Sequence, residues 1–141
     1  MSSTAMPRFS IAGRSTSTIL RQRHTATATA GGVATSALVG PASGKKWWIA
    51  AAVVEARFLT NPGGGDSGST LGEVVGNAPD VTFIGRNAAP SGEEGAQFSN
   101  AAPGITLEFG DEIRISVDAV NSAQDIGGTL TFWGFEYDDI S

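Results

Sequence analysis

The sequence has no cysteine, one histidine and no apolar run long enough to cross a bilayer. Without cysteine, neither disulfide bonds nor thiolate metal sites contribute to the chain. Charged residues make up only 16% of the chain, and this scarcity disfavours a helical bundle, which needs more Leu, Glu and Lys. We therefore expect neither a membrane partner nor an all-helical fold.

Glycine, serine, threonine and alanine are abundant, as in β-rich proteins with many turns, and 141 residues suit a single domain. The charge is unevenly distributed. Residues 1–30 contain four arginines and no acid, whereas the remainder has five basic residues against fourteen acidic ones, a net charge of −9. An acidic body argues against nucleic acid as the main partner, because phosphate binding needs a basic face.

Residues 1–30 are predicted to form an extended basic N-terminal arm, and residues 31–141 a β-sandwich domain. The arm has too few apolar residues for a core of its own, so it is expected to lie on an acidic neighbouring subunit rather than fold back on its own domain. Nucleic-acid contact remains open for the arm alone. Its expected partner-binding residues are Arg8, Phe9, Arg14, Arg21 and Arg23.

The clearest strand pattern lies near the C-terminus, between residues 105 and 137. Ile113, Ile115 and Val117 alternate with polar residues, which is typical of a strand with one buried face. A similar alternation over residues 105–109 precedes it, and an aromatic-rich run over residues 130–137 follows. With a turn at each joint, these three strands are predicted to form one antiparallel unit.

Residues 45–59 are ambiguous, because their alanines favour a helix whereas the Trp-Trp-Ile and Val-Val runs favour a strand. We prefer a strand buried on both faces. Shorter strands are expected at 25–30, 35–39, 71–75 and 81–84, and loops at 61–69 and 87–104. A loop as long as 87–104 is usually functional or held by a neighbour.

Two glycine-rich motifs overlap in the first loop. Gly63 to Gly68 matches G-x-G-x-x-G, but no suitable helix follows, so a dinucleotide site is not expected. Gly65-Asp66-Ser67-Gly68 is similar to the nucleophile segment of chymotrypsin-like proteases. That chemistry needs a histidine base, and the only histidine, His24, lies in the arm. We therefore expect that the protein is not an enzyme and that it has no catalytic residues and no cofactor.

Acidic pairs occur at 93–94, 111–112 and 138–139. Carboxylates bind calcium, but these pairs do not have the spacing of a calcium-binding loop. We therefore interpret them as solvated charges in loops and predict no metal site.

Large aromatic residues occur on both faces of the expected strands, which admits two interpretations. They form the core between the sheets, or they form a subunit interface, where Trp and Tyr are enriched. Neighbouring strand residues point to opposite faces of a sheet, so Trp47 and Trp48 lie on opposite faces. A second sheet or a neighbouring subunit is expected to cover each of these faces. The predicted oligomer-interface residues are Trp47, Trp48, Trp133, Phe135 and Tyr137.

Three segments together resemble small virion proteins of tailed bacteriophages: Pro41-Ala42-Ser43-Gly44-Lys45, then Leu107 to Ile113, then Thr131 to Glu136. In those proteins a P-A-G-K strand start, an L-x-x-G-D-x-I turn and a closing G-F-E strand lie on a jelly-roll sandwich. The last two segments are also similar to the TNF/C1q-like jelly roll, which commonly trimerises. This sequence departs from the pattern in its Pro-Ala-Ser-Gly and in the long 87–104 loop.

The residue patterns and this resemblance together predict an all-β, jelly-roll-like sandwich of about eight strands with an N-terminal arm. The resemblance implies a structural virion protein, a capsid decoration or minor head protein that binds capsid or other virion proteins. It would act as a homo-oligomer, with a trimer expected first, and reside in virions assembled in the host cytoplasm. The alternative is a tail or fibre component whose 61–70 and 87–104 loops bind a host receptor or glycan.

Overall fold

The computed structural model describes residues 17–60, 62–63, 65–76, 81–88 and 97–140. These residues form nine strands in two antiparallel sheets, and the predicted all-β sandwich is confirmed. The strands are β1 (Thr18–Ala28), β2 (Val33–Thr35), β3 (Lys45–Phe58), β4 (Ser67–Val75), β5 (Val81–Ala88), β6 (Gln97–Ala101), β7 (Ile105–Leu107), β8 (Glu112–Asn121) and β9 (Ile126–Asp138). The described residues include no helix that could span a membrane.

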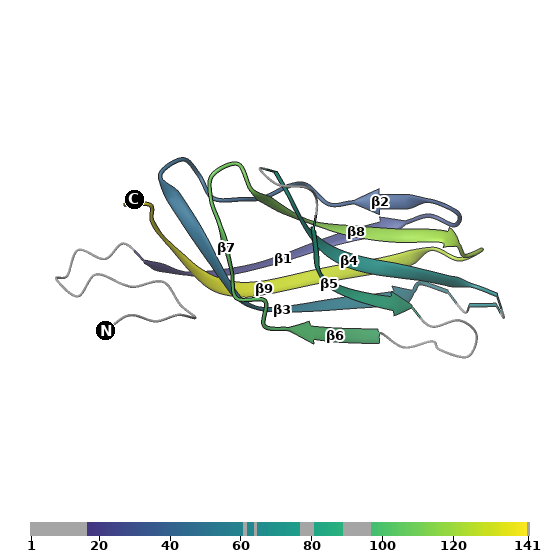
Figure 1. Ribbon diagram of the computed structural model, residues 1–141. Coiled ribbons are helices and arrows are strands. Elements are labelled where there is room, and N and C mark those ends of the chain that lie inside the picture. The colour runs from purple at the N-terminus through teal and green to yellow at the C-terminus, as the bar shows by residue number, and fades with distance from the viewer. Residues whose placement is uncertain (1–16, 61, 64, 77–80, 89–96, 141) are drawn as a thin grey trace.

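The two sheets lie face to face, with their strands running along the long axis of the molecule (Figure 1). The five-stranded sheet has the order β1-β9-β3-β6, and β7 also pairs with β3. The four-stranded sheet has the order β2-β8-β4-β5. The ambiguous segment 45–59 is a strand, as preferred, and β3 is paired on both sides at the centre of its sheet.

The core lies between the sheets and follows the predicted alternation. In β8, Ile113, Ile115 and Val117 are fully buried, and in β9 Leu130 and Phe132 face them from the other sheet. Because each strand residue points opposite to its neighbour, the side chains between these buried positions lie on the outer faces. The sequence pattern thus fixes which side of each sheet meets the partner sheet.

The expectation that the last three strands form one antiparallel unit is wrong. β7 pairs with β3 and β9 pairs with β1 and β3, whereas β8 pairs with β2 and β4 in the other sheet. The turn after β7 therefore crosses between sheets. It is closed by the N–H of Asp111, which donates to the carbonyl of Glu108 at 2.9 Å, and by Gly110 with φ 101°.

The predicted arm needs a correction in its described part. Residues 18–28 form β1, which pairs with β9 from Thr18 to Ala28 and contributes Leu20 and Ala28 to the core. Every second position of this segment faces inward, and Leu20 near its start and Ala28 at its end are apolar and buried, so the segment is an edge strand of the sandwich. Residues 1–16 lie outside the described residues.

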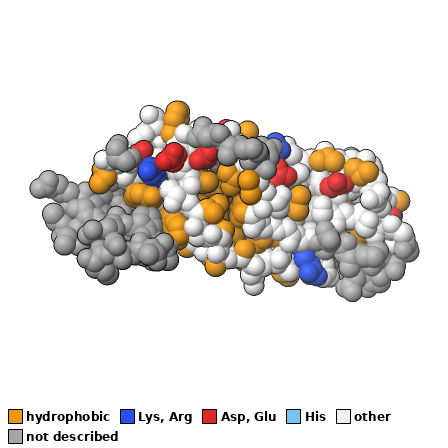
Figure 2. Space-filling view, viewed as in Figure 1, with side chains coloured by type: hydrophobic (Ala, Val, Ile, Leu, Met, Phe, Trp, Pro, Cys, Tyr) orange, Lys and Arg blue, Asp and Glu red, His pale blue; other side chains and the backbone are white. Residues whose placement is uncertain are grey.

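Two of the expected loops are also shorter than predicted. β4 begins at Ser67, within the segment expected as the 61–69 loop, and β6 occupies 97–101 of the expected 87–104 loop. Figure 2 shows hydrophobic side chains gathered in the middle of the molecule in this view. Val74, Phe83, Ala101 and Ile105 are half-buried and pack against the core.

Candidate binding face

The outer face of the five-stranded sheet carries large side chains that the core does not use. In β9, Phe132 is fully buried, so Trp133 and Phe135 point outward, and both are half-buried. Arg21 of β1 pairs with Trp133 on one side, and Ala51 of β3 pairs with it on the other. The rings therefore lie in the middle of the sheet, with paired strands on both sides.

Three strands bring apolar side chains together at one end of this face. Phe135 pairs with Ile19 of β1 and with Trp48 of β3, and directly paired residues on one face lie side by side. Ile19 is 82% exposed. We call the group Ile19, Trp48, Trp133 and Phe135 the aromatic end.

The close approach of β3 and β9 at the aromatic end depends on a glycine. A Cβ at Gly134 would lie 1.6 Å from the carbonyl oxygen of Trp48, so no other residue fits without moving the backbone. The register of the two strands shifts between Ile49 and Ala51, beside this contact. Gly134 thereby allows Trp48 and Phe135 to lie at adjacent positions of one flat face.

The indole of Trp48 packs over a turn. A Cβ at Gly104 would lie 3.2 Å from the ring atom Cη2 of Trp48, and Gly104 has a φ of 58°. The Trp48 Nε1 is buried and has no hydrogen-bond partner. Among the residues that the structure describes, packing contacts and no side-chain hydrogen bond hold this ring in place.

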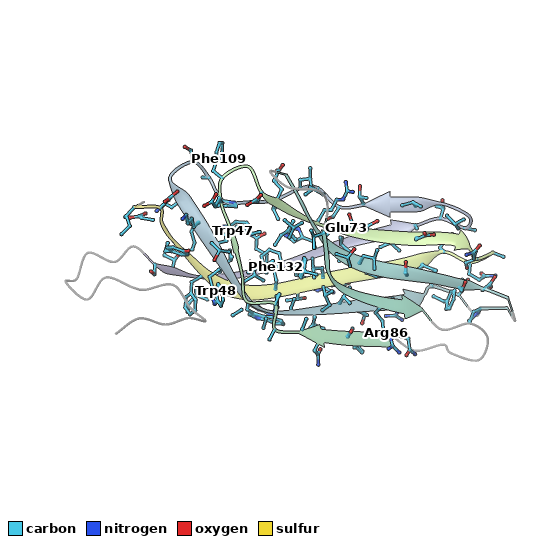
Figure 3. The ribbon with its side chains drawn as sticks, viewed as in Figure 1. Trp47, Trp48, Glu73, Arg86, Phe109 and Phe132 are labelled. Atoms are coloured by element: carbon cyan, nitrogen blue, oxygen red, sulfur yellow. The ribbon has the colours of Figure 1, made fainter. Side chains whose placement is uncertain are left out.

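Trp47 does not belong to the predicted interface. It is 4% exposed, its Nε1 donates to Glu136 Oε2 at 2.9 Å, and its ring centre lies 6.0 Å from that of Phe132. Figure 3 shows Trp47 and Phe132 between the sheets and Trp48 on the other side of β3. Strand alternation sends one tryptophan of the pair inward and the other outward, so Trp47 is a core residue.

The remaining predicted residues fall in different places. Tyr137 is half-buried and pairs with Lys46. Arg21 and Arg23 are exposed on the outer face of β1, while Arg8, Phe9 and Arg14 lie outside the described residues. The structure thus brings the two described arm arginines onto the same face as the aromatic end.

A shallow hollow of 170 Å³ lies further along this face, beyond Trp133. We call it the polar hollow. It is open to solvent and lined by Arg23, Val53, Glu55, Phe98, Thr129 and Thr131. Sequence analysis identified only Arg23 among these, because the others come together through the pairing of β1, β9, β3 and β6.

The outer face of the four-stranded sheet is different. Glu73 of β4 and Arg114 of β8 are directly paired, and their charged groups form an ion pair at 3.1 Å. Ser116 and Asp118 continue β8 on this face between buried positions. Since its principal opposite charges are matched within the chain, this face resembles an ordinary solvated surface.

The glycine-rich loop has a structural role. The Asp66 carboxylate accepts hydrogen bonds from the N–H of Ala123 at 2.9 Å and of Gly63 at 2.7 Å. These two donors lower the pKa of Asp66 below its usual value, because they stabilise the charged form. Asp66 therefore fastens the loop to the turn between β8 and β9.

His24 is also engaged in structural contacts. It faces the interior from β1, stacks on Phe132 with ring centres 5.9 Å apart, and its Nε2 lies 2.8 Å from Gln22 Oε1. Partial burial lowers its pKa, because the charged imidazolium loses hydration. No group of three or more metal-ligating side chains occurs among the described residues.

No protein-family model matches the sequence, and no curated protein matches it. Among solved structures, FLHE aligns with 87% of this chain and 98% of its own at 10% identity and a TM-score of 0.39. A CBM4 structure aligns with 81% and 82% at 16% identity and 0.38. VP2 of infectious bursal disease virus, from a subviral particle, aligns with 92% and 38% at 11% identity and 0.37. Similarities this distant carry no argument about what the chain binds or where it acts.

Proposed function

We propose that this chain is a non-catalytic structural protein of a virus particle, a capsid decoration or minor head protein that attaches to its neighbours through the outer face of the five-stranded sheet. The aromatic end is the observation that supports this role. It places three aromatic rings on strands that are paired on both sides, and the exposed Ile19 of the edge strand β1 beside them on the same face.

The physical basis is adhesion by burial of apolar surface. Each large aromatic side chain buries about 150–250 Å² when fully covered, and Trp and Tyr dominate interface energies. A standard interface buries about 800 Å² on each partner, more than the partly buried aromatic end offers by itself. The contact must therefore extend to other residues, and the basic residues of 1–16 are the natural candidates for an acidic neighbour.

Oligomerisation belongs to the same proposal. A decoration protein that forms a homo-oligomer, with a trimer as the first expectation, multiplies weak contacts with the shell because linked sites bind with a raised effective concentration. In this arrangement the particle would be its location, and capsid or other virion proteins its partners.

The test is attachment to particles. We expect a Trp133→Ala/Phe135→Ala variant to remain folded and to lose at least about tenfold in particle occupancy, measured by quantitative mass spectrometry of purified particles. The matched control, Leu71→Ala/Val75→Ala, removes half-buried apolar side chains from the outer face of the four-stranded sheet. Equal occupancy of both variants would reject the proposed contact.

The same measurement separates the main proposal from its alternative, a tail or fibre component that binds a host receptor or glycan. A decoration protein is present in many copies per particle, whereas a receptor-binding protein is present in few and at the tail. The polar hollow supports this alternative, because its lining includes charged and hydroxyl side chains that can form hydrogen bonds with a glycan.

A further inference from the structure

We propose that the polar hollow binds a neutral carbohydrate, with one sugar ring seated over Thr129 and Thr131. This inference goes beyond the particle contact, which uses the aromatic end of the same face. It stands on the geometry of the hollow and on the chemistry of its lining.

The hollow arises from side-chain length in two neighbouring rows of the sheet. In one row, Thr131 of β9 lies between Arg23 of β1 and Val53 of β3. In the next row on this face, Glu55 of β3 pairs with Thr129 on one side and with Phe98 of β6 on the other. The short side chains of Thr129, Thr131 and Val53 form a floor, and the longer side chains of Arg23, Glu55 and Phe98 form the rim.

The two charged groups on the rim are available to a ligand. The Arg23 guanidinium and the Glu55 carboxylate form no ion pair and no hydrogen bond with any other residue that the structure describes. Arg23 contributes only donors and Glu55 only acceptors, while each threonine hydroxyl both donates and accepts. A ligand in the hollow therefore meets both kinds of hydrogen-bonding partner within one ring's reach.

This lining favours ligands without a net charge. Glu55 repels an anion and Arg23 repels a cation, because the two charges are held on opposite sides of the same small floor. A neutral molecule with several hydroxyl groups satisfies both, since a hydroxyl accepts from the guanidinium and donates to the carboxylate. Carbohydrates are the common class of biological molecule with this chemistry.

Size and the aromatic rim agree with a single sugar ring. A volume of 170 Å³ corresponds to about six water molecules at ~30 Å³ each, which is small for a drug-sized ligand. Phe98 is 59% exposed on β6 at the rim, and its flat face offers apolar surface to the C–H groups of a sugar. The hollow is open, so longer chains can extend along the sheet in either direction.

The experiment is a titration of the ¹⁵N-labelled full chain with malto-, cello-, manno- and chito-hexaose, followed by amide chemical shifts. We expect at least one of these neutral oligosaccharides to shift amides around Thr129 and Thr131. Glu55→Ala and Phe98→Ala are each expected to raise its Kd by about tenfold or more. Arg57→Ala is the matched control, because Arg57 lies two residues from Glu55 on the same strand face but does not line the hollow.

Three outcomes would overturn the inference. In the first, none of the four sugars shifts any amide signal at about 10 mM, a concentration at which even millimolar affinity is visible. In the second, the shifts are centred on the aromatic end instead of the hollow. In the third, Glu55→Ala and Phe98→Ala leave the Kd unchanged. The spectrum of each variant reports whether it is folded. Particle occupancy is measured separately, so loss of sugar binding and loss of the proposed virion role are distinguishable.

Discussion

On the outer face of the four-stranded sheet, Glu73 and Arg114 face each other across β4 and β8 and form an ion pair at 3.1 Å. On the outer face of the five-stranded sheet, Arg23 and Glu55 have no such partner among the residues that the structure describes, and aromatic rings occupy the neighbouring rows. Both faces arise from the same strand alternation. The difference teaches that two central charges of one face pair with each other, whereas the other face carries charged and aromatic side chains that a second molecule would contact.

The largest expected effect comes from disturbing the flat arrangement of the aromatic end. Gly134→Ala would force a Cβ against the carbonyl of Trp48, so we expect a loss of about 3 kcal/mol or more in the free energy of unfolding. Gly127→Ala is the control in the same strand, since its Cβ would meet side chains and no backbone, with Leu59 Cδ2 nearest at 3.1 Å. Denaturant unfolding measures both, and equal losses would show that the close approach at Gly134 is unimportant.

A substitution that should stabilise the protein tests the packing between the inner faces of the two sheets. The Thr70 hydroxyl is fully buried in β4 and has no hydrogen-bond partner in the described part of the chain. Thr70→Val keeps the shape and removes the unpaired hydroxyl, so we expect a gain of about 1 kcal/mol in the free energy of unfolding. A loss of stability in chemical denaturation would show that the hydroxyl is satisfied in solution.

A pair of isosteric changes sharpens the comparison of charges. Glu73→Gln removes one charge of a partly buried ion pair, and a loss of up to about 1 kcal/mol is expected. Glu55→Gln removes a charge that pairs with no other described residue, so the free energy of unfolding should stay nearly constant. If Glu55→Gln proves the more costly of the two, the account of the two faces is incorrect.

The smallest expected effect concerns pH. Because burial lowers the pKa of His24 from 6.5, the unfolded chain binds this proton more readily than the folded chain does. The contribution of neutral His24 is fully present above pH 6.5 and is lost as the pH falls from 6.5 through the lowered pKa. His24→Gln should flatten the stability curve in this range, measured as melting temperature against pH. An unchanged curve would refute this role of His24.

The sequence allowed the strands to be predicted but not their partners. Alternation over 105–109 and 113–118 and the aromatic-rich run over 130–137 predicted three strands, which the structure has at 105–107, 112–121 and 126–138, since burial of one face is a local pattern. Their distribution between two sheets escaped prediction, because the same Gly110-Asp111 turn serves a hairpin and a crossing between sheets. Only the packing of the whole core decides between the two.

The candidate site was predicted in part for the same reason. Trp133 and Phe135 lie on an outer face, as an interface requires, whereas Trp47 turned out to be a core residue, because alternation alone does not tell which tryptophan of a pair faces inward. The polar hollow escaped prediction, since Arg23, Glu55 and Phe98 come from three strands far apart in sequence.

The central claim is that the outer face of the five-stranded sheet is the face that binds. Hydroxyl-radical footprinting of the isolated chain and of the chain in its particle tests this most directly. We expect oxidation of Trp133 and Phe135 to fall by about tenfold on assembly, while Leu71 on the opposite outer face stays unchanged. Protection of Leu71 with Trp133 still fully reactive would contradict the claim.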